Sequence, residues 1–477
     1  MKNLAKLLCS LSFILFLVRC TPRQNNPTTW INPQNTKTRG IETCPLAAKI
    51  VTKSESIPAT RFLPMALDPT YESYIVKFKE AHSISSSGNT VHEYAIGMMQ
   101  LKSISGSLYN MRISGSTVDK SKVLTQLAQQ PDIEYIEPDY PIEAIPQTSA
   151  LDVPDDPYFA KQWFHQTLNS LSAWSITEGS SDVLVAIVDT GIDYTHPDLV
   201  NNIWTNPNEI VNGQDDDDNG WIDDIHGWNF VANNNDPRTT TRSPHGSHVA
   251  GLIGASGNNH IGVVGVAPKV KMIALKFMDD SGAGVTSNAV KAIDYAIQKK
   301  VFLINNSWGS NRYSRSLSDA ITRAANAGIL FMAAAGNGDK GIGYDLKNKA
   351  WYPASYPQWN VFSVAATDSR DQLAPFSNYA KTKVDVAAPG YSIYSTVSDE
   401  NYQMMSGTSM ATPIVSGMAV LLKATNPHLN SGQILDILRQ STDKLPHLKD
   451  KIISGGRVNA YEAVLLAQAS RNCEDRE

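Results

Sequence analysis

The sequence has little cysteine and little net charge, and each shortage narrows what the chain can be. Four cysteines in 477 residues are too few for a disulfide-stapled scaffold. A formal net charge of −5 gives no basic footprint, so we expect no nucleic-acid partner. Apolar material is plentiful: 42% of the residues are hydrophobic, which is enough for a large core, and the length corresponds to about three domains.

Long apolar runs are scarce as well. After Lys2 and Lys6 an apolar stretch covers residues 7–18, which is too short for a typical membrane-spanning helix and fits a secretory signal over residues 1–20. No other stretch reaches the ~18 apolar residues that a spanning helix needs, so we expect no such helix in the mature chain. The signal predicts export, to the extracellular space or the cell envelope.

Cys20 stands at the end of this signal and leaves two interpretations open. A cysteine there resembles a bacterial lipobox, which would make Cys20 a lipidated membrane anchor, although Arg19 stands where a small residue is usual. The alternative is an ordinary signal with a chance cysteine. If Cys20 is lipidated, Cys44 and Cys473 remain as a pair, and an oxidising compartment favours a disulfide between them, with Cys20 as a competing partner.

Composition and periodicity divide the remainder of the chain. Alternating apolar residues at 74–78 and 108–113, a helical pattern at 123–127 and a further strand at 133–139 indicate a small α+β domain. The residues before it are rich in Asn, Thr, Pro and Gln, which is typical of a linker. The predicted segments are a linker (21–67), a small domain (68–145), a large domain (152–467) and a C-terminal tail (468–477).

A serine among small residues opens a helical pattern near the C-terminus. Ser409 lies in GTSMATP (residues 407–413), and apolar residues at helical spacing continue to Leu422. This places Ser409 at or near a helix N-terminus, where unpaired N–H groups and the helix dipole favour developing negative charge. A nucleophilic serine needs such a position, together with a base and a carboxylate.

Both partners lie upstream. The apolar, β-branched run at residues 183–188 predicts a strand that is buried on both faces, and Asp189 follows it at the carboxyl end, where α/β sheets carry ligands. His245 begins HGSHVAG (residues 245–251), whose small residues allow tight packing at the start of a helix. Asp189, His245 and Ser409 therefore occur in the chain order of the subtilisin triad.

These blocks resemble the signature motifs of subtilisin-like serine proteases, in particular of the thermitase-like bacterial branch. The resemblance spans roughly residues 152–467 and implies a doubly wound, mostly parallel α/β sheet with helices on both faces. By position, Asn337 is similar to the oxyanion-hole asparagine of the family. The four blocks are DTGID (189–193), HGSH (245–248), AAAGN (333–337) and GTSMA (407–411).

Each block alone has a simpler explanation. An aspartate after a strand is usually a turn residue, a serine before a helix is usually a cap, and two nearby histidines are often packing residues or a metal pair. GNGDKG (336–341) fits a dinucleotide-binding pattern, but loop residues follow it instead of a helix, so we reject that interpretation. An esterase-like acyl hydrolase usually has Gly-x-Ser-x-Gly and the order Ser…Asp…His, and this chain has neither. Four blocks in the right order favour the protease.

The resemblance implies a role for each residue. Ser409 attacks a peptide carbonyl, His245 takes the proton and returns it to the leaving amine, and Asp189 holds the imidazole tautomer. The Asn337 side chain and the Ser409 N–H stabilise the oxyanion.

Two segments resemble those that flank the peptide and line the primary pocket in the family. They are residues 333–336 and the run Ser307, Trp308 and Gly309, in which Trp308 stands where many relatives have leucine. A core tryptophan is the alternative for Trp308. Neither contains an acidic residue, so we expect an apolar or aromatic side chain before the scissile bond.

The small domain resembles the inhibitory propeptide of secreted subtilisins. This implies an autoprocessed zymogen, with the chain's own propeptide as an intramolecular inhibitor and a cleavage site between residues 139 and 156. An unrelated small domain is the alternative.

A dense acidic loop, DDDDNGWIDD (residues 215–224), predicts calcium. Alternating oxygen ligands with glycine in the sixth position are typical of an EF-hand-like loop, although the closing glutamate is missing. So many like charges repel one another unless a cation screens them, and the alternative is a solvated acidic turn. The expected ligands are Asp215, Asp217, Asn219, the carbonyl of Trp221, and Asp224.

A second calcium site is implied by the resemblance alone. The loop at residues 256–263 is similar to the family's calcium loop with one extra residue, which leaves Asn258 as an alternative to Asn259. The implied ligands are Asp156, Asp198, Asn259 and the carbonyls of Ile261 and Val263.

The sequence therefore predicts an exported serine endopeptidase that acts as a monomer on protein or peptide substrates. A catalytically restricted processing protease, or a surface binding protein on the same fold, is the alternative, and substrate profiling would separate these readings.

Overall fold

The computed structural model describes residues 73–79, 99–105, 107–113, 120–139, 153–240 and 242–474, without the side chains of 99–105 and 472–474. The chain divides into two compact units, whose described residues are those up to 153 and those from 154 onward. The predicted signal, the linker, Cys20, Cys44 and most of the expected cleavage segment lie outside the described residues, as does the side chain of Cys473.

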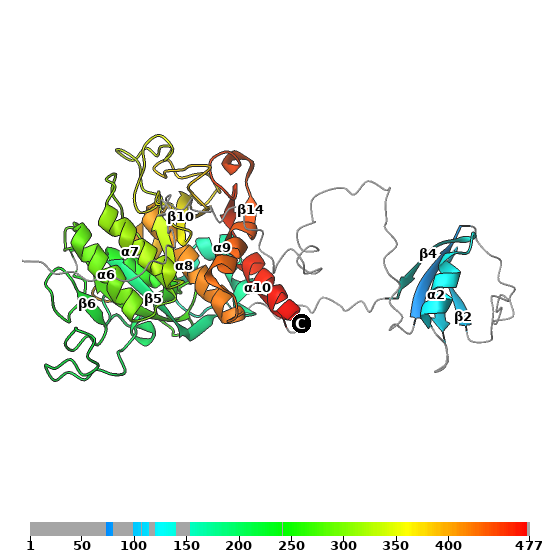
Figure 1. Cartoon of the computed structure of the whole chain (residues 1–477), viewed down its shortest axis with the longest axis horizontal. Coiled ribbons are helices and arrows are strands. Elements are labelled where there is room, and N and C mark those ends of the chain that lie inside the picture. The colour runs from blue at the N-terminus through cyan, green and yellow to red at the C-terminus, as the bar shows by residue number, and fades with distance from the viewer. Residues whose placement is uncertain are drawn as a thin grey trace, which may run out of the picture. The chain divides into compact units, whose positions relative to one another are not determined.

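The smaller unit is a four-stranded antiparallel sheet with one helix, α2, packed against it (Figure 1). Along β1, Tyr74, Val76 and Phe78 are buried and alternate with more exposed residues, which is the period of a sheet with one covered face. Leu124 of α2 completes this core. The strand at 99–105 is an addition to the elements expected from the sequence. In the sheet order β2-β3-β1-β4, the bounds are Met99–Ser105, Leu108–Ile113, Ser73–Phe78 and Ile133–Pro138, and α2 is Lys120–Ala128.

The larger unit is built on a nine-stranded sheet in which every pairing is parallel except the one between β14 and β15. Its central strands are buried throughout, as the continuous apolar run before Asp189 predicts. In sheet order the strands are β14 (Thr442–Lys444), β15 (Gly456–Val458), β11 (Val386–Pro389), β10 (Val361–Thr367), β9 (Leu330–Ala334), β8 (Leu303–Asn306), β5 (Gly179–Asp189), β7 (Lys269–Lys276) and β6 (Gly227–Asn229).

The strand order reverses beside β5. From β5 the chain passes to β6 and β7 on one side, and then crosses to β8, β9, β10 and β11 on the other. The carboxyl ends of the strands at such a reversal form the crevice where open α/β sheets bind ligands. Asp189 ends β5, Ser307 directly follows β8, and Asn337 comes shortly after β9, so the topology gathers these residues at one edge of the sheet.

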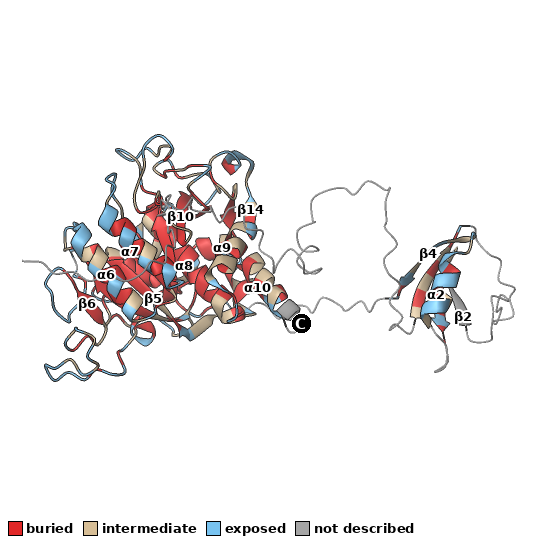
Figure 2. Cartoon of the chain, viewed as in Figure 1, coloured by how far each residue is buried: buried red, intermediate tan, exposed pale blue. Residues whose placement is uncertain are grey.

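Helices cover both faces of the large sheet, so the predicted doubly wound α/β fold is confirmed. Figure 2 shows the buried strands and helices of the core surrounded by more exposed loops. One apolar cluster lies under α3 (Phe164–Leu168), α4 (Ser170–Trp174), α5 (His245–Gly254), α8 (Thr408–Thr425), α9 (Ser431–Gln440) and α10 (Ala460–Glu474), and the other under α6 (Thr286–Gln298) and α7 (Arg315–Asn326). A hairpin of β12 (Ile393–Thr396) and β13 (Tyr402–Met405) and 3-10 turns at Phe159–Lys161, Val200–Asn202 and Pro446–Leu448 complete the unit.

Helix α8 is the central helix of the first face. It packs on the strands β5, β8, β9, β10 and β11 and on the helices α5, α9 and α10. The helix is apolar and buried around nearly its whole circumference, as expected of a core helix. Gly417 is required here because a side chain at that position would come 2.7 Å from Cβ of Val266. The nucleophile expected from the sequence therefore lies in the first turn of a helix that is buried along nearly its whole length.

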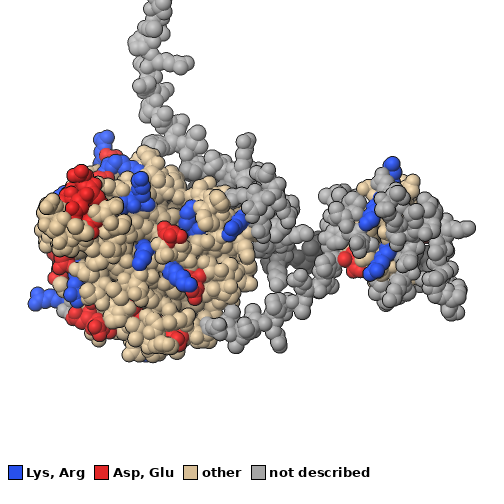
Figure 3. Space-filling model, turned by 90° about the horizontal axis from the view of Figure 1, so that it is seen from below, with Lys and Arg blue, Asp and Glu red and all other residues tan. Residues whose placement is uncertain are grey.

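No helix within the described residues is both long enough and apolar enough to cross a membrane. On the face of the molecule drawn in Figure 3, lysine and arginine side chains are scattered among acidic and uncharged ones.

We expect Leu422→Ala to lower the free energy of unfolding by about 2–5 kcal/mol, because Leu422 is fully buried in α8 and its loss leaves a cavity. The measurement is urea unfolding in a Ser409→Ala background, which the resemblance predicts to be unable to digest itself. Ile342→Ala is the control, since Ile342 is 72% exposed and should change the same quantity by less than ~0.5 kcal/mol. Equal losses in the two variants would contradict the packing described for α8.

Candidate active site

Asp189 and His245 form the first pair of the site. Nδ1 of His245 lies 2.8 Å from Oδ1 of Asp189, whose side chain is fully buried. Oδ1 also accepts the N–H of Thr190 at 2.7 Å, while Oδ2 has no hydrogen-bond partner among the described residues. The imidazole keeps 30% of its surface exposed. With Nδ1 held by the carboxylate, Nε2 is left to meet a second group.

Glycine at position 246 allows α5 to start against the turn that follows β5. A side chain there would lie 2.0 Å from the carbonyl oxygen of Gly191, which no other residue could tolerate. The N–H of Gly246 donates to the hydroxyl of Thr190 at 3.0 Å. The small residues of HGSH thus bring His245 within reach of Asp189.

The two histidines of α5 differ in their ionisation. Burial alone would lower the pKa of His245, but the Asp189 carboxylate outweighs it and raises the pKa above its ordinary value. For His248, burial and then the neighbouring His245 lower the pKa to about 3. Nε2 of His248 lies 3.1 and 3.0 Å from the carbonyl oxygens of Ile393 and Gln403, so this ring fastens α5 to the β12–β13 hairpin. His248 is therefore a neutral packing residue, and the pair does not resemble a metal site.

Ser409 is held by two reciprocal hydrogen bonds to Ser307. The hydroxyl of Ser409 donates to the carbonyl oxygen of Ser307 at 2.8 Å, and the hydroxyl of Ser307 donates to the carbonyl oxygen of Ser409 at 2.9 Å. Among the described residues, no hydrogen bond joins Ser409 Oγ to His245 Nε2. Loose or absent contacts between nucleophile and base are common in unliganded sites.

Pro413 explains why the Ser409 carbonyl is free. In a regular helix that carbonyl would accept the N–H of residue 413, four positions later, but proline has none. The hydroxyl of Ser307 takes its place. Thus a proline inside α8 makes room for a bond that joins the first turn of α8 to the end of β8.

A buried chain of hydrogen bonds holds the side chain of Ser307 in place. The Ser416 hydroxyl donates to Oδ1 of Asn305 at 2.8 Å, and Nδ2 of Asn305 donates to the Ser307 hydroxyl at 3.0 Å. Asn305 and Ser416 are fully buried and Ser307 nearly so. Each group in the chain has a partner, which rigidifies such a network instead of leaving a buried polar group unpaired.

Asn337 is fastened to the start of α8 through one atom only. Its Oδ1 accepts both the N–H and the hydroxyl of Thr408, each at 2.9 Å, and the Thr408 hydroxyl in turn accepts the N–H of Gly336 at 3.1 Å. Nδ2 of Asn337 has no acceptor among the described residues. The Ser409 N–H belongs to the first turn of α8, where helix amides lack an intrahelical acceptor. Two N–H donors therefore lie beside the serine.

Trp308 turns its polar edge away from the site. Its Nε1 donates to the carbonyl oxygen of Val188 at 2.8 Å, and its ring packs 4.7 Å from that of Phe277, centroid to centroid. The side chain is half-buried against the core of the second face. The indole of Trp308 therefore packs on the core, and the part of this segment that can flank a substrate is the backbone of Ser307 and Gly309.

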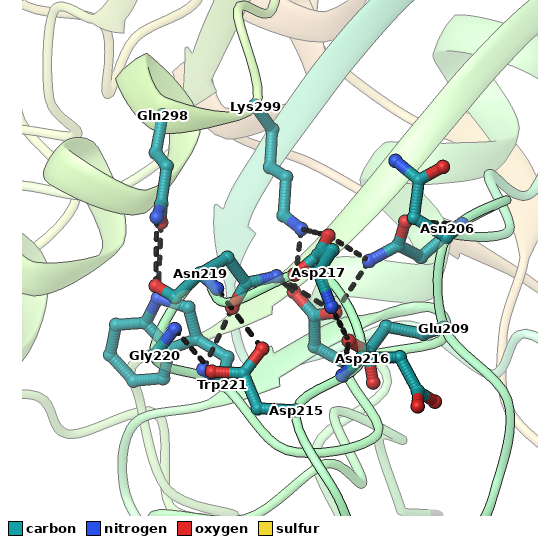
Figure 4. Close-up of polar contacts among 12 residues, drawn as sticks. Asn206, Glu209, Asp215, Asp216, Asp217, Asn219, Gly220, Trp221, Gln298 and Lys299 are labelled. Carbon is teal, nitrogen blue, oxygen red and sulfur yellow. Dashed lines mark hydrogen bonds and ion pairs between the residues drawn. The ribbon is translucent and has the colours of Figure 1, made fainter.

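The acidic loop brings together only part of the ligand set expected from the sequence (Figure 4). Carboxylate oxygens of Asp217, Asp224 and Glu209 lie within 4.8 Å of one another and could hold a metal ion. Asp215 instead accepts the N–H groups of Asn219 and Gly220, at 3.0 and 2.7 Å, and so shapes the turn.

The amide of Asn219, expected as a further ligand in this loop, has other neighbours. Nδ2 of Asn219 lies 3.2 Å from Oδ2 of Asp224, so the amide presents its nitrogen to the carboxylate, and its Oδ1 accepts the N–H of Trp221. The indole of Trp221 reaches Gln298 at 3.2 Å.

Lys299 places a positive charge against this cluster. Its Nζ lies 2.9 Å from Asp224 and 3.3 Å from Asp217, and the side chain is only 9% exposed. Burial acts in the opposite direction, but a hydrogen bond from Asn206 and the ammonium of Lys299 hold the pKa of Asp217 below its ordinary value. Oδ1 of Asp217 remains buried without a partner, which leaves a ligand atom for a metal.

The position expected for a second calcium ion holds a pair of buried carboxylates. Oδ1 of Asp156 is buried without a partner, and Oδ2 accepts the N–H of Asn258 at 2.8 Å. Asp198 is fully buried and accepts Nδ2 of Asn259 and the N–H of Val263, at 2.8 and 2.9 Å. Burial raises the pKa of Asp198 to about 6 and also raises that of Asp156.

Among the two candidate amides, it is Asn259 that faces Asp198. Ile261 lies in the same loop, and its N–H donates to Oδ1 of Asn259 at 3.0 Å. The loop can pass this close because residue 262 is a glycine at φ +56°, where a side chain would lie 1.9 Å from Oδ2 of Asp198.

Several residues of these sites carry no local sequence signal. Glu209 and Lys299 join the acidic cluster from outside the loop, and Asn305 and Ser416 support the serine from elements that are far apart in the sequence. From the periodicity of the sequence, each of these four residues would be taken for an ordinary surface or core residue. The Pro413 in the helix was the one available clue, because it marks a missing donor.

Comparison with known proteins agrees with this geometry. A family model described as the subtilase family matches residues 180–456. The thermophilic serine proteinase of Bacillus sp. (strain AK1) is 34% identical over 391 residues, which is 82% of this chain and 86% of that protein. Thermitase of Thermoactinomyces vulgaris is 36% identical over 312 residues, which is 65% of this chain and 99% of that protein.

A longer relative matches in part. Subtilisin-like protease 1 of Plasmodium berghei (strain Anka) is 41% identical over 303 residues, which is 60% of this chain, and the chain spans about half the length of that relative (50%). The predicted resemblance is confirmed by these matches. The chain belongs to the subtilase family of serine endopeptidases.

Proposed function

We propose that this chain hydrolyses peptide bonds with Ser409 as nucleophile, His245 as general base and Asp189 as the group that orients the base. The observation that carries the proposal is the 2.8 Å bond between His245 Nδ1 and a fully buried Asp189, at the crevice where the strand order reverses. A buried carboxylate on Nδ1 fixes the tautomer that leaves Nε2 free to accept a proton.

The hydroxyl of Ser409 exchanges its bond to the Ser307 carbonyl for one to His245 Nε2 as the reaction begins. Nε2 then takes the hydroxyl proton while Oγ forms a bond to the peptide carbonyl carbon, and the imidazolium is stabilised by Asp189. The same proton passes to the leaving amine, and water repeats the sequence on the acyl-enzyme.

The oxyanion is stabilised by Nδ2 of Asn337 and by the N–H of Ser409. Neither donor has an acceptor among the described residues, and the two bonds from Thr408 to Oδ1 of Asn337 leave the amide nitrogen for the reacting carbonyl. Fixed donors of this kind are worth about 10²–10³ in kcat, a figure established on subtilisin.

The proposed substrates are proteins and peptides, and the enzyme is proposed to act as a monomer. The substrate chain would lie between the backbone of Ser307, Trp308 and Gly309 on one side and residues 333–336 on the other. A restricted processing protease is the competing reading, and so is a surface binding protein, which would be expected to lack a member of the triad. Cleavage of many unrelated proteins would favour a degradative role over a processing one.

Calcium is the proposed structural metal at both carboxylate sites, the Asp156–Asp198 site and the acidic loop. It would offset the negative charge there and would take no part in the reaction. The Asp156–Asp198 site has an unpartnered buried carboxylate oxygen and no cationic side chain paired with it among the described residues, and calcium prefers oxygen ligands. In the acidic loop, Asp217, Asp224 and Glu209 offer carboxylates beside Lys299.

The N-terminal unit is proposed to be an inhibitory propeptide that the enzyme removes itself. It forms a compact sheet of its own and precedes the protease unit, which begins at residue 154. Export follows from the predicted signal, and lipidation of Cys20 and a bridge between Cys44 and Cys473 remain further predictions. Mass spectrometry of the mature N-terminus would locate the cleavage site and any lipid.

We expect Ser409→Ala to lower casein hydrolysis by a factor on the order of 10⁶, the loss known for the corresponding change in subtilisin. Ser406→Ala is the matched control, because Ser406 is exposed and only accepts the N–H of Ser392. Purified protein is assayed under one set of conditions. Equal activity in Ser409→Ala and wild type would end the proposal.

The same variant tests autoprocessing. In Ser409→Ala protein the N-terminal unit should stay covalently attached, whereas wild type should lose it, as followed by mass on a denaturing gel. Normal maturation of purified Ser409→Ala protein, without another protease, would show that the cut is not autocatalytic.

We expect activity to rise with pH through the pKa of His245, which lies above its ordinary value of about 6.5. The base must be neutral, so protonation below that pKa removes activity. Asp189→Asn takes away the charge that raises the pKa; the inflection should then move to lower pH, and kcat should fall by about 10⁴, as in another serine protease triad. The measurement is kcat/KM from pH 5 to 9.

His447→Gln is the control for this profile, since His447 is remote from the triad and bonded to the carbonyl of Asp371. His248, with its pKa of about 3, does not titrate in the range. An inflection that stays in place in Asp189→Asn protein would contradict the assignment to His245.

We expect calcium to raise the melting temperature by several degrees over protein in chelator. A ligand bound only by the folded state adds roughly 2.7 kcal/mol at a hundredfold excess over Kd. Asp156→Asn and Asp217→Ala should each shrink the difference, and Asp319→Asn, an exposed carboxylate on α7, should not. Melting is followed in the Ser409→Ala background; an identical melting temperature with and without calcium would refute both sites.

A further inference from the structure

The indole of Trp351 lies between the two segments that are proposed to flank the substrate. A side chain on Gly309 would come 2.2 Å from its Nε1 and 2.8 Å from its Cε2. A side chain on Gly336 would come 2.8 Å from both Nε1 and Cδ1 of the same ring. The indole therefore touches both segments in the place where their own side chains are missing.

The backbone around Trp351 fixes the ring in this position. The next residue, Tyr352, exchanges two hydrogen bonds of 2.7 Å with Ser310, which directly follows Gly309. The N–H of Trp351 donates to the hydroxyl of Ser355 at 3.2 Å, and the N–H of Ser355 returns to the Trp351 carbonyl at 2.8 Å. The backbone next to Trp351 is thus paired with the residue that follows Gly309, in the first of the two flanking segments.

The opposite side of Gly336 is also occupied. Gly336 has φ +94°, a conformation that side chains rarely adopt, and Nδ2 of Asn378 lies 2.7 Å from the missing side chain. Nδ2 of Asn378 donates to the carbonyl oxygen of Ala335 at 2.9 Å, so it cannot readily withdraw. Gly336 therefore cannot move away from the indole to open the space.

The indole N–H of Trp351 is buried and has no acceptor among the described residues. Buried indole N–H groups usually find a partner. Elsewhere in this unit those of Trp163, Trp174 and Trp308 each donate to a carbonyl oxygen at 2.8–3.0 Å, whereas that of Trp228 is also buried without a partner among the described residues. What distinguishes Trp351 is the place of its unpaired atom, because Nε1 would lie 2.2 Å from a side chain on Gly309 and 2.8 Å from one on Gly336.

We propose that Trp351 sets the size of the residue accepted before the scissile bond, and that this residue is small: glycine, alanine or serine. The inference rests on the proposed function and narrows the sequence-based expectation of an apolar or aromatic residue there. A long side chain entering between Gly309 and Gly336 meets the indole. A difference of a single methylene in such a position is already worth about 10–200-fold in kcat/KM, so an aromatic ring is rejected more strongly.

The test compares two peptide substrates that differ only in alanine or phenylalanine before the scissile bond. For wild type we expect kcat/KM to favour alanine by at least about 10²-fold. In Trp351→Ala protein the ratio should shift toward phenylalanine by at least tenfold, mainly because the phenylalanine peptide gains a lower KM. Tyr313→Ala is the matched control: its ring is 59% exposed and packs on Tyr352 and Tyr356, so the ratio should stay at the wild-type value.

The outcomes separate this inference from the proposed function. Wild type that cleaves no peptide and no casein overturns the proposed function. Wild type that cleaves both peptides equally well, or prefers phenylalanine, overturns the role of Trp351 alone. If Trp351→Ala fails to fold, Trp351→Leu and competition between alanine and phenylalanine peptide aldehydes on wild type give the same comparison; tighter binding of the phenylalanine aldehyde to wild type would overturn the inference.

Discussion

The two hydrogen bonds between Ser307 and Ser409 join the first turn of α8 to the end of β8, and the geometry of the site depends on them. They exist because Pro413 cannot donate to the Ser409 carbonyl, which is then open to a side chain from another element. Thr408 attaches the same turn to Asn337, after β9. A serine, two amide donors and two strand ends are thus fixed by short bonds around the start of one buried helix.

Three groups of buried carboxylates carry negative charge inside the protein, and each group has a different set of neighbours to offset it. Asp189 has the imidazole of His245, whose pKa rises in response. Asp224 has the ammonium of Lys299. Asp198, together with Asp156, has hydrogen bonds but no cationic side chain among the described residues, and burial raises its pKa. Because a buried charge without a counter-charge is costly, the case for calcium is stronger at the third group than at the second, where a built-in cation already offsets the charge.

The sequence predicted what depends on local pattern. A continuous apolar run before Asp189 indicates a buried parallel strand, and a polar residue at its carboxyl end indicates a site, since strand ends gather at one edge of such a sheet. The contacts that the sequence did not reveal are long-range. Lys299 reaches Asp217 across 82 residues and Asn305 reaches Ser416 across 111, and neither spacing follows a helix or strand period. The strand at 99–105 lacked a clear alternation to mark it.

The groups proposed for chemistry and the group proposed for selectivity occupy different kinds of structure in this chain. Asp189 ends a strand and Ser409 begins a helix, so both are positioned by elements whose own hydrogen bonds leave little freedom. Trp351 lies in a loop between β9 and β10 and reaches the same crevice from outside the sheet. A loop residue can change size without disturbing the strand ends that hold the triad. The pairing of Tyr352 with Ser310 then explains how a loop can still present a ring in a defined place, because two backbone hydrogen bonds tie the residue after Trp351 to the residue after Gly309.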